Sequence, residues 1–308
     1  MTRERSSVPS RPKPVNNLLD SINKCNHRGR QGTDRIHQTC SNNNREEEDD
    51  KDEDEDEDDG DEEDEVDKEN EQEESRSKVT HEKREHNGNE LGLYAIFDGH
   101  SGGKVAEYLQ HHLFDNILSE PDFWTSPKCA IKRAYKKTDD QILEGVVSSR
   151  GGSTAAMAIL INREKLIVAN VGDSRANMCE NGKAKQITVD HEPQKERELV
   201  ESRGGFVSQR PGNVPRVDRQ LAMTRAFGNE KVKDHIPSEL DIFIENIDKG
   251  TEFILLASDG LWKVMSNQEA ADSIMAIDDA REASKALIRE AMSRKSPDDI
   301  SCIVEKFE

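Results

Sequence analysis

The sequence has 308 residues, of which 35% are charged and 32% hydrophobic, and its formal net charge at pH 7 is −20. Such averages are typical of a disordered chain, but the acidic charge is concentrated: 23 acidic residues lie between Glu46 and Glu74. The rest of the chain is therefore free to form a folded domain. The five cysteines are scattered, and none forms a Cys-x-x-Cys pair, which argues against a disulfide framework and a thiolate zinc site.

The first 77 residues predict a disordered tail that is basic and then acidic. Residues 1–45 lack a sustained apolar period, and the acidic tract that follows repels itself. A solvated spacer is the favoured interpretation of this tract, and a docking arm for a basic partner is the alternative. No signal peptide, membrane-length apolar stretch or basic groove with interleaved aromatic residues is found. We therefore expect a cytoplasmic or nuclear protein that binds neither membrane nor nucleic acid.

Residues 78–308 predict one folded domain, because apolar periods and turn signals follow each other regularly. Strands that follow one another through hairpins, with helices in separate blocks, favour an α+β fold. We expect an antiparallel β-sandwich flanked by helices on both faces. Strands are predicted at 91–97, 154–161, 166–171, 175–180, 183–188, 252–257 and 300–307, and helices at 104–118, 128–147, 192–202, 267–277 and 280–293.

Acidic residues stand at the ends of several predicted strands. Asp98, Asp173 and Asp259 each follow an apolar run, and the pair Asp298-Asp299 precedes the last one. Each acid alone is typical of a turn. Four such positions in one domain indicate a carboxylate cluster, which needs a cation to offset its mutual repulsion. Oxygen ligands favour Mg²⁺ or Mn²⁺, and two such ions can activate a water for phosphoryl transfer.

A series of segments carries a family resemblance. "FDGHSGG", "GGSTAAMAIL", "VANVGDSRA", "DHEP", "RAFGN", "ASDGLWKVMSNQEA" and "DDISCIV" occur in this order. The series resembles the metal-dependent type 2C serine/threonine protein phosphatases, and "ESRGGFVS" and "PGNVPRVDRQLA" resemble the plant members in particular. The resemblance covers residues 91–308.

The resemblance implies a site with two Mn²⁺ or Mg²⁺ ions. The family's bridging aspartate is matched by Asp98, and its carbonyl ligand by Gly99. Two further ligands are matched by Asp259 and Asp298, and an acid of a third, weaker metal position by Asp173. The fold implied is the same antiparallel sandwich with helices on both outer faces.

The implied reaction is hydrolysis of phosphoserine or phosphothreonine by metal-activated water, without a covalent intermediate, in a monomer that acts on phosphorylated proteins. His100 resembles the residue that protonates the leaving oxygen, and its alternative role is a turn residue before a helix. Asp299 stands where the family often has Asn and is the weaker metal candidate.

The chain also departs from the family pattern. The family's early hairpin with a Met-Glu-Asp segment and an upstream phosphate-binding Arg is expected to be lacking, and no acid in 78–90 has a matching context. Two alternatives therefore stay open: an impaired pseudophosphatase that binds phosphoproteins or acts as a scaffold, and a shortened chain that does not fold stably. The acids without a match are Glu82, Glu85 and Glu90, and further departures are Arg219, Asn229 and Leu240.

Overall fold

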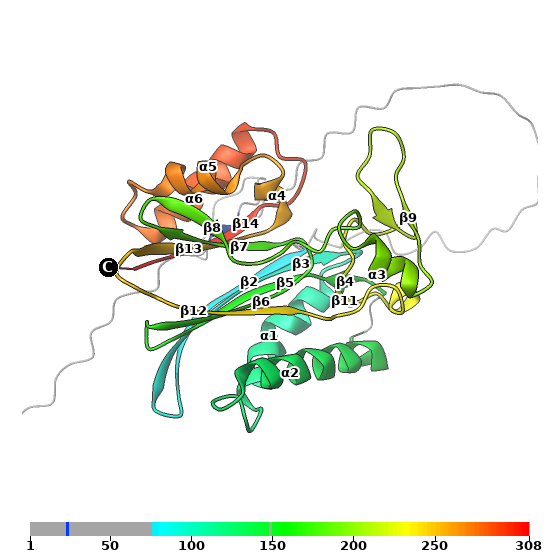
Figure 1. Ribbon diagram of the computed structural model, residues 1–308, viewed down its shortest axis with the longest axis horizontal. Coiled ribbons are helices and arrows are strands. Elements are labelled where there is room, and N and C mark those ends of the chain that lie inside the picture. The colour runs from blue at the N-terminus through cyan, green and yellow to red at the C-terminus, as the bar shows by residue number, and fades with distance from the viewer. Residues whose placement is uncertain (1–22, 25–75, 148–149, 308) are drawn as a thin grey trace, which may run out of the picture.

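Two β-sheets pack face to face, and helices cover both outer faces (Figure 1). The computed structural model describes residues 23–24, 76–147 and 150–307. Its helices and antiparallel sheets confirm the predicted α+β sandwich. The other residues of the predicted tail lie outside the described ranges, so the division at residue 77 stays a prediction.

The first sheet carries the Asp-Gly-His segment on its central strand β3. It has seven strands in the order β11-β4-β3-β5-β6-β12, and β2 also pairs with β3. Every pair is antiparallel. The strands are β2 (Ser77–His86), β3 (Asn89–His100), β4 (Gly152–Ser153), β5 (Ala155–Ile161), β6 (Lys165–Val171), β11 (Phe227–Gly228) and β12 (Asp241–Asn246).

The second sheet has five antiparallel strands in the order β1-β14-β13-β7-β8. Apolar side chains from both sheets meet between them in one buried cluster that includes Ile96, Leu256 and Ile303. This cluster fixes the two sheets against each other. The strands are β1 (Asn23–Lys24), β7 (Arg175–Glu180), β8 (Lys183–Gln186), β13 (Thr251–Ala257) and β14 (Ser301–Lys306).

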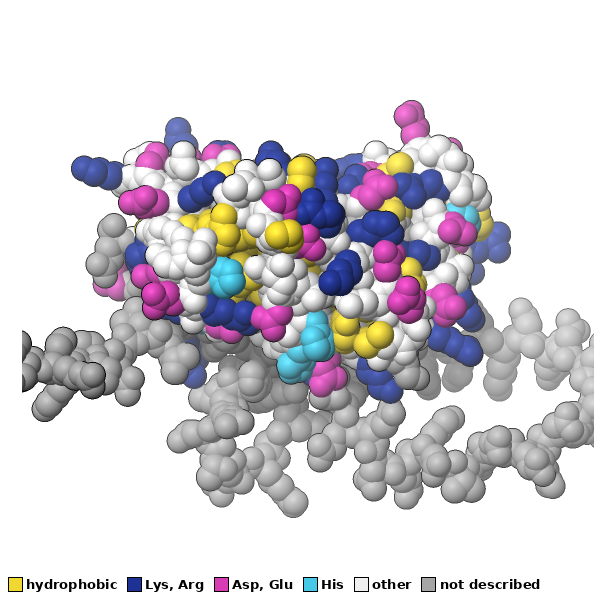
Figure 2. Space-filling model, turned by 90° about the horizontal axis from the view of Figure 1, so that it is seen from below, with side chains coloured by type: hydrophobic (Ala, Val, Ile, Leu, Met, Phe, Trp, Pro, Cys, Tyr) yellow, Lys and Arg dark blue, Asp and Glu magenta, His cyan; other side chains and the backbone are white. Residues whose placement is uncertain are grey.

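Four longer helices close the outer faces. The helices α1 (Lys104–Leu118) and α2 (Pro127–Gln141) cover the first sheet, and α5 (Asn267–Ile274) and α6 (Ala280–Ser293) cover the second (Figure 1). On the face below α1 and α2, charged side chains of both signs are interspersed (Figure 2), as expected of amphipathic helices. No helix within the described ranges is long and apolar enough to cross a membrane.

Local signals in the sequence explain several helix boundaries. The predicted helix at 104–118 is confirmed with the same bounds. Ser266 and Glu269 form a reciprocal capping box that starts α5. The side chain of Asp279 accepts a hydrogen bond from the backbone of Glu282 and starts α6. Shorter elements are η1 (Ile142–Val146), α3 (Arg197–Ser202), β9 (Val207–Ser208), β10 (Arg216–Val217), η2 (Glu230–Val232) and α4 (Asp259–Trp262).

The strand β2 was not predicted from the sequence. It pairs with β3 along its whole length, from Ser77 opposite Asp98 to His86 opposite Asn89. A turn at Asn87-Gly88, with both residues at positive φ, joins the two strands. The β2–β3 hairpin is therefore present, although we expected an early hairpin of the family to be lacking. A hairpin before β2 would fall on residues outside the described part.

Candidate metal centre

A cavity of about 630 Å³ lies where the ends of both sheets meet. It is lined by Asp98 from β3, by Asp173 from the β6–β7 loop and by Asp259 at the start of α4. The segment before β14 adds two more acids. The structure thus brings the sequence-predicted acids to one place, and the residues concerned are Asp98, Gly99, His100, Asp173, Asp259, Asp298 and Asp299.

On the first-sheet side, one threonine ties the two acidic strand ends together. The backbone N–H of Asp98 donates to Thr154 Oγ1 at 3.2 Å, and the N–H of Thr154 donates to the Asp98 carbonyl at 3.0 Å. The hydroxyl of Thr154 also lies 3.0 Å from that of Ser174. Gly172 has φ of +105°, and a Cβ there would come within 2.5 Å of Thr154 Cγ2. Only glycine therefore lets the loop that carries Asp173 approach this closely.

On the second-sheet side, hydrogen bonds and a second glycine hold α4 against the segment before β14. Ser258 donates from its backbone N–H to the Ser301 carbonyl at 2.9 Å and from its hydroxyl to the Asp299 carbonyl at 3.0 Å. A Cβ at Gly260 would come within 2.3 Å of that Asp299 carbonyl oxygen. This contact sets Asp259 beside the Asp298-Asp299 pair.

The carboxylates destabilise one another. Burial raises the pKa of Asp98 well above its usual value, and repulsion from Asp259 and Asp298 raises it further. Burial and then Asp259 likewise raise the pKa of Asp173. The Oδ1 atoms of Asp173 and Asp259 are buried without a hydrogen-bond partner. A divalent cation would satisfy these oxygens, so the residues present fit the metal that the sequence predicted.

A lysine that the sequence analysis did not single out lies among these acids. Lys263 Nζ is 2.6 Å from an oxygen of Asp259 and 2.6 Å from an oxygen of Asp298. Burial opposes the charge of Lys263, but the two carboxylates raise its pKa. Within 76–147 and 150–307, no three acidic, His or Cys side chains are placed to ligate one ion as they stand. Lys263 occupies one oxygen of each of these two carboxylates.

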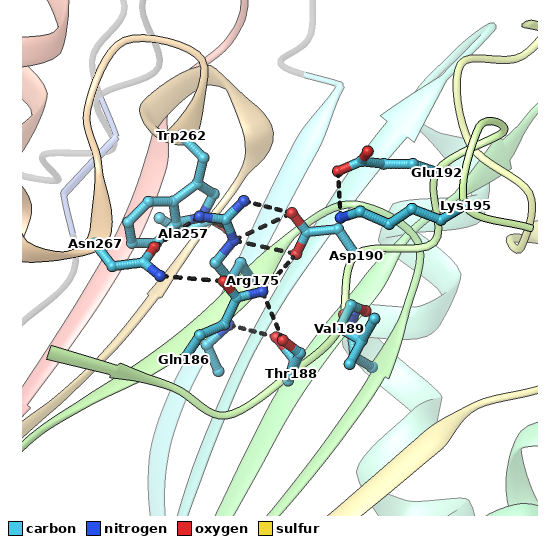
Figure 3. Close-up of polar contacts among 12 residues, drawn as sticks. Arg175, Gln186, Thr188, Val189, Asp190, Glu192, Lys195, Ala257, Trp262 and Asn267 are labelled. Carbon is cyan, nitrogen blue, oxygen red and sulfur yellow. Dashed lines mark hydrogen bonds and ion pairs between the residues drawn. The ribbon is translucent and has the colours of Figure 1, made fainter. Parts of the chain in front are cut away.

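An arginine fixes the tryptophan next to this lysine (Figure 3). The guanidinium of Arg175 makes a bidentate ion pair with Asp190 and donates to Asn267 Oδ1 at 2.7 Å. It also stacks over the Trp262 ring at 4.9 Å from the ring centroid. The ring N–H of Trp262 donates to the Ala257 carbonyl at 3.0 Å. The Trp262 ring is thereby held at one face and at its N–H, and the segment 186–190 is tied to α5 through Asn267.

His100 lies in the cavity with one nitrogen occupied. Its Nε2 is 3.0 Å from Asn229 Oδ1, which assigns a proton to Nε2, and its Nδ1 is buried without a partner. Burial lowers the pKa of His100, and the Asn229 hydrogen bond opposes this only in part. The imidazole is therefore neutral near pH 7.

A second histidine holds the backbone before Asp173. His191 Nδ1 accepts the N–H of Gly172 at 3.0 Å, and its Nε2 donates to Asp241 at 3.0 Å. Nδ1 can accept only when it carries no proton. Burial, and then the nearby charge of Arg225, lower the pKa of His191 and keep it in this form.

The acids of the β2–β3 hairpin do not reach the cavity. Glu82, Glu85 and Glu90 lie toward the turn, away from Asp98, and none of them lines the cavity. The residue at the cavity edge is instead Arg76, whose carbonyl would be 2.5 Å from a Cβ on Gly99. Arg76 directly precedes Ser77, which pairs with Asp98. Because β2 was not predicted from the sequence, the position of Arg76 at the cavity could not be predicted either.

The remaining departures from the family pattern have separate structural settings. Arg219 has φ of 61° and stacks on Phe206, 5.8 Å from its ring centroid. Asn229 is left-handed too, with φ of 60°, and contacts His100. Leu240 is buried in the core beneath the first sheet.

Comparisons with known proteins agree with the motifs. The sequence pattern of the family described as protein phosphatase 2C matches residues 58–300. Probable protein phosphatase 2C 28 of Arabidopsis thaliana is 65% identical over 221 residues, which cover 71% of this chain and 65% of the relative. Probable protein phosphatase 2C 58 of the same plant is 60% identical over 230 residues, which cover 74% of this chain and 81% of the relative. The chain thus spans slightly less than two thirds of the first relative.

Solved structures share the fold at low sequence identity. A sex-determining protein of C. elegans matches with a TM-score of 0.65 and 23% identity, over 74% of this chain and 63% of that one. A serine-threonine phosphatase 2C from Toxoplasma gondii matches with a TM-score of 0.62 and 21% identity, over 75% of this chain and 94% of that one. At these identities the likeness concerns the architecture.

Proposed function

The chain belongs to the protein phosphatase 2C family, whose members are metal-dependent protein phosphatases, and we propose that it hydrolyses phosphoserine and phosphothreonine in protein substrates. The observation that carries the proposal is the cavity where acids from both sheets converge. Their raised pKa values, caused by burial and mutual repulsion, mark a site that gains stability from bound cations. Membership of the family supports phosphate hydrolysis as the reaction, and the clustered carboxylates support a divalent cation as the cofactor.

Two Mn²⁺ or Mg²⁺ ions would be held by Asp98, the Gly99 carbonyl, Asp259 and Asp298, with Asp173 at a further position. Bound there, they would lower the pKa of a water that attacks phosphorus and would neutralise the charge of the phosphoryl group. The protein's own part is to fix these oxygens. The Thr154 bridge fixes the Asp98 side, and the contacts of Ser258 and Gly260 with Asp299 fix the other.

His100 is the proposed proton donor to the leaving serine or threonine oxygen. It lines the cavity beside the acids, and Asn229 orients its ring through Nε2. Nδ1 has the free lone pair and is the atom that would take up and release a proton. Because burial lowers its pKa, only a minor fraction of His100 carries that proton near pH 7.

Basic residues on the cavity rim suit a phosphorylated substrate. Arg76, directly before β2, and Arg216 from β10 both line the cavity. A phosphate dianion that enters the cavity would gain favourable interactions with these guanidinium groups. Arg76 is our candidate for the role of the family's upstream phosphate-binding arginine, which the sequence was expected to lack.

A second candidate function has an observation in its favour. Lys263 bridges Asp259 and Asp298, and no glutamate of the β2–β3 hairpin lines the cavity. Both features weaken cation binding. A protein that binds phosphorylated partners without turning them over is therefore the alternative, and the acidic tract with a basic partner remains a separate prediction outside the described residues.

Hydrolysis of a phosphothreonine peptide by the full chain separates the two candidates. We expect release of phosphate that requires Mn²⁺ and saturates at millimolar concentrations, because the second ion lacks an upstream carboxylate. Asp98→Ala should abolish the activity, and Asp115→Asn, on the exposed side of α1, should retain it. Binding of the peptide without turnover at any Mn²⁺ concentration would select the non-catalytic alternative.

A further inference from the structure

We propose that Lys263 is a built-in counter-cation that competes with a divalent ion for Asp259 and Asp298, and that it thereby sets the metal affinity of the site. The inference rests on the proposed metal centre and adds a residue that determines how tightly it binds. Lys263 lies one turn after Asp259 on the same helical segment. Its Nζ is 2.6 Å from the Oδ2 atoms of both carboxylates.

The competition follows from which oxygens are free. The Oδ2 atoms of both acids contact Lys263, and Asp298 Oδ1 accepts the backbone N–H of Asp299 at 3.0 Å. Asp259 Oδ1 is the one oxygen of the two carboxylates that is buried and without a partner. A Mg²⁺ or Mn²⁺ ion binds carboxylate oxygens at about 2 Å. An ion on either Oδ2 would therefore lie next to the ammonium, and the two positive charges would repel strongly.

Lys263 can leave without a change in the backbone. Its side chain is 38% exposed, whereas that of Asp259 is 19% exposed, so the lysine is the more accessible of the two and can turn toward solvent. The residue before it is held firmly. Trp262 is fixed by Arg175 on its ring face and by the Ala257 carbonyl at its ring N–H (Figure 3). Displacement of the lysine is thus a rotation of one side chain about a fixed α4.

The lysine and the ion are alternative ways to neutralise the same carboxylates. Without metal, Lys263 lowers the repulsion among the acids and stabilises the fold. With metal, that contribution is lost, so part of the binding free energy is consumed in displacing the lysine. The site then binds metal more weakly than the same acids would without Lys263. Without metal, the fold also loses less stability than it would without Lys263.

The first test compares Mn²⁺ affinity in the full chain by isothermal titration calorimetry. Lys263→Gln shortens the side chain by one atom, keeps a hydrogen-bond donor and removes the charge, and we expect its Kd to fall by about tenfold. Lys285→Gln is the matched control, because Lys285 pairs with Glu282 on α6, away from the cavity. Its Kd should equal that of the wild type. Without metal, Lys263→Gln should melt at a lower temperature than the wild type, and saturating Mn²⁺ should remove that difference.

A second measurement needs no variant and covers the case in which Lys263→Gln does not fold. The wild-type chain is acetylated briefly with and without Mn²⁺, and the modification of Lys263 and Lys285 is quantified by mass spectrometry. Release of Lys263 by the ion should raise its reactivity several-fold, while Lys285 stays constant. Equal reactivity of Lys263 in both states, or equal Kd values in wild type and Lys263→Gln, would overturn the role of the lysine and leave the metal site intact. Absence of Mn²⁺ binding in both proteins would overturn the metal site itself.

Discussion

The two walls of the cavity differ in how their carboxylates are compensated. The first sheet contributes Asp98 and Asp173, and no ion pair to either occurs among the residues that the structure describes. The second-sheet side contributes Asp259 and Asp298, which share Lys263. The difference teaches that the second-sheet wall is partly neutralised by the protein itself, whereas the first-sheet wall depends on an added cation. Attraction for a divalent cation is therefore strongest at the first-sheet wall, and exchange with the lysine occurs at the second.

Neutral substitutions on the two walls should show this difference most strongly. In metal-free protein, Asp98→Asn removes an uncompensated charge and should raise the melting temperature by a few degrees. Asp259→Asn leaves Lys263 with one partner and should lower it. In Mn²⁺, both variants should lose at least about a hundredfold in phosphatase activity. Differential scanning fluorimetry in EDTA and in Mn²⁺ gives the stabilities. A rise of equal size in both variants would show that Lys263 does not compensate Asp259.

The contact between His100 and Asn229 tests the proton chemistry at the first-sheet wall. Asn229→Asp places a carboxylate 3.0 Å from Nε2 and should raise the pKa of His100 by about one unit or more. The protonated fraction at pH 7 then increases, and the alkaline limb of the pH–rate profile should move upward by the same amount. Titration of the His100 ring protons by NMR gives the pKa directly.

A matched variant controls for the added charge. Asn162→Asp also replaces an asparagine in the left-handed region, φ 51°, but in the turn between β5 and β6. It should leave the pKa of His100 and the pH–rate profile unchanged. A shifted His100 pKa with an unaltered profile would exclude His100 as the proton donor.

Acidification should weaken the support beneath Asp173. The folded protein lowers the pKa of His191, so below about pH 6.5 the unfolded chain binds more protons at this residue than the folded chain does. Stability from His191 is therefore complete above that pH and is lost as the pH falls toward the folded pKa. His191→Asn keeps an acceptor for the Gly172 N–H and cannot titrate. Between pH 7.5 and 5.5 it should lose about 1 kcal/mol less unfolding free energy than the wild type in urea titrations. The same loss in both proteins would contradict the assignment.

One hairpin from each sheet has a glycine at positive φ in its turn. Gly88 in the β2–β3 turn and Gly182 in the β7–β8 turn have φ of +72° and +74°, and a Cβ at either position would lie in open space, with no contact within 4 Å. Alanine at either site should cost about 1 kcal/mol from the left-handed backbone alone. Urea unfolding of both variants measures the costs. A negligible cost for Gly88→Ala beside a normal cost for Gly182→Ala would show that β2 contributes little to the fold.

Hydrophobic periodicity in the sequence determined the main elements and the order in which acids follow them. The helix at 104–118 has the predicted bounds, because its apolar positions recur at helical spacing and Leu118 is its last buried residue. The strands that deliver Asp98 and Asp259 are continuous apolar runs. Such runs are visible without any knowledge of their neighbours. The sequence alone therefore predicted an α+β sandwich with acids gathered at its strand ends.

Tertiary structure decided the elements whose side chains are polar. The strand β2 carries Lys83, Arg84 and Glu85 along an edge, and it is held mainly by pairing with β3, with Val79 as its buried apolar residue. The predicted helix at 192–202 begins only at Arg197. The carboxylate of Glu196 there accepts hydrogen bonds from Thr224 and pairs with Arg225, residues far along the chain.

Tertiary structure also decided which charges meet in the cavity. Asp98 and Asp298 are two hundred positions apart in the chain, yet both line one cavity with Lys263 and Arg76. A sequence pattern reports which residues face a core, because burial of apolar side chains recurs with the period of the helix or strand. It does not report which charged side chains become neighbours, since that depends on how two sheets pack and on close approaches such as the one at Gly260. The acids could be identified from the sequence, whereas Lys263, which pairs with two of them, was identified only from the packing.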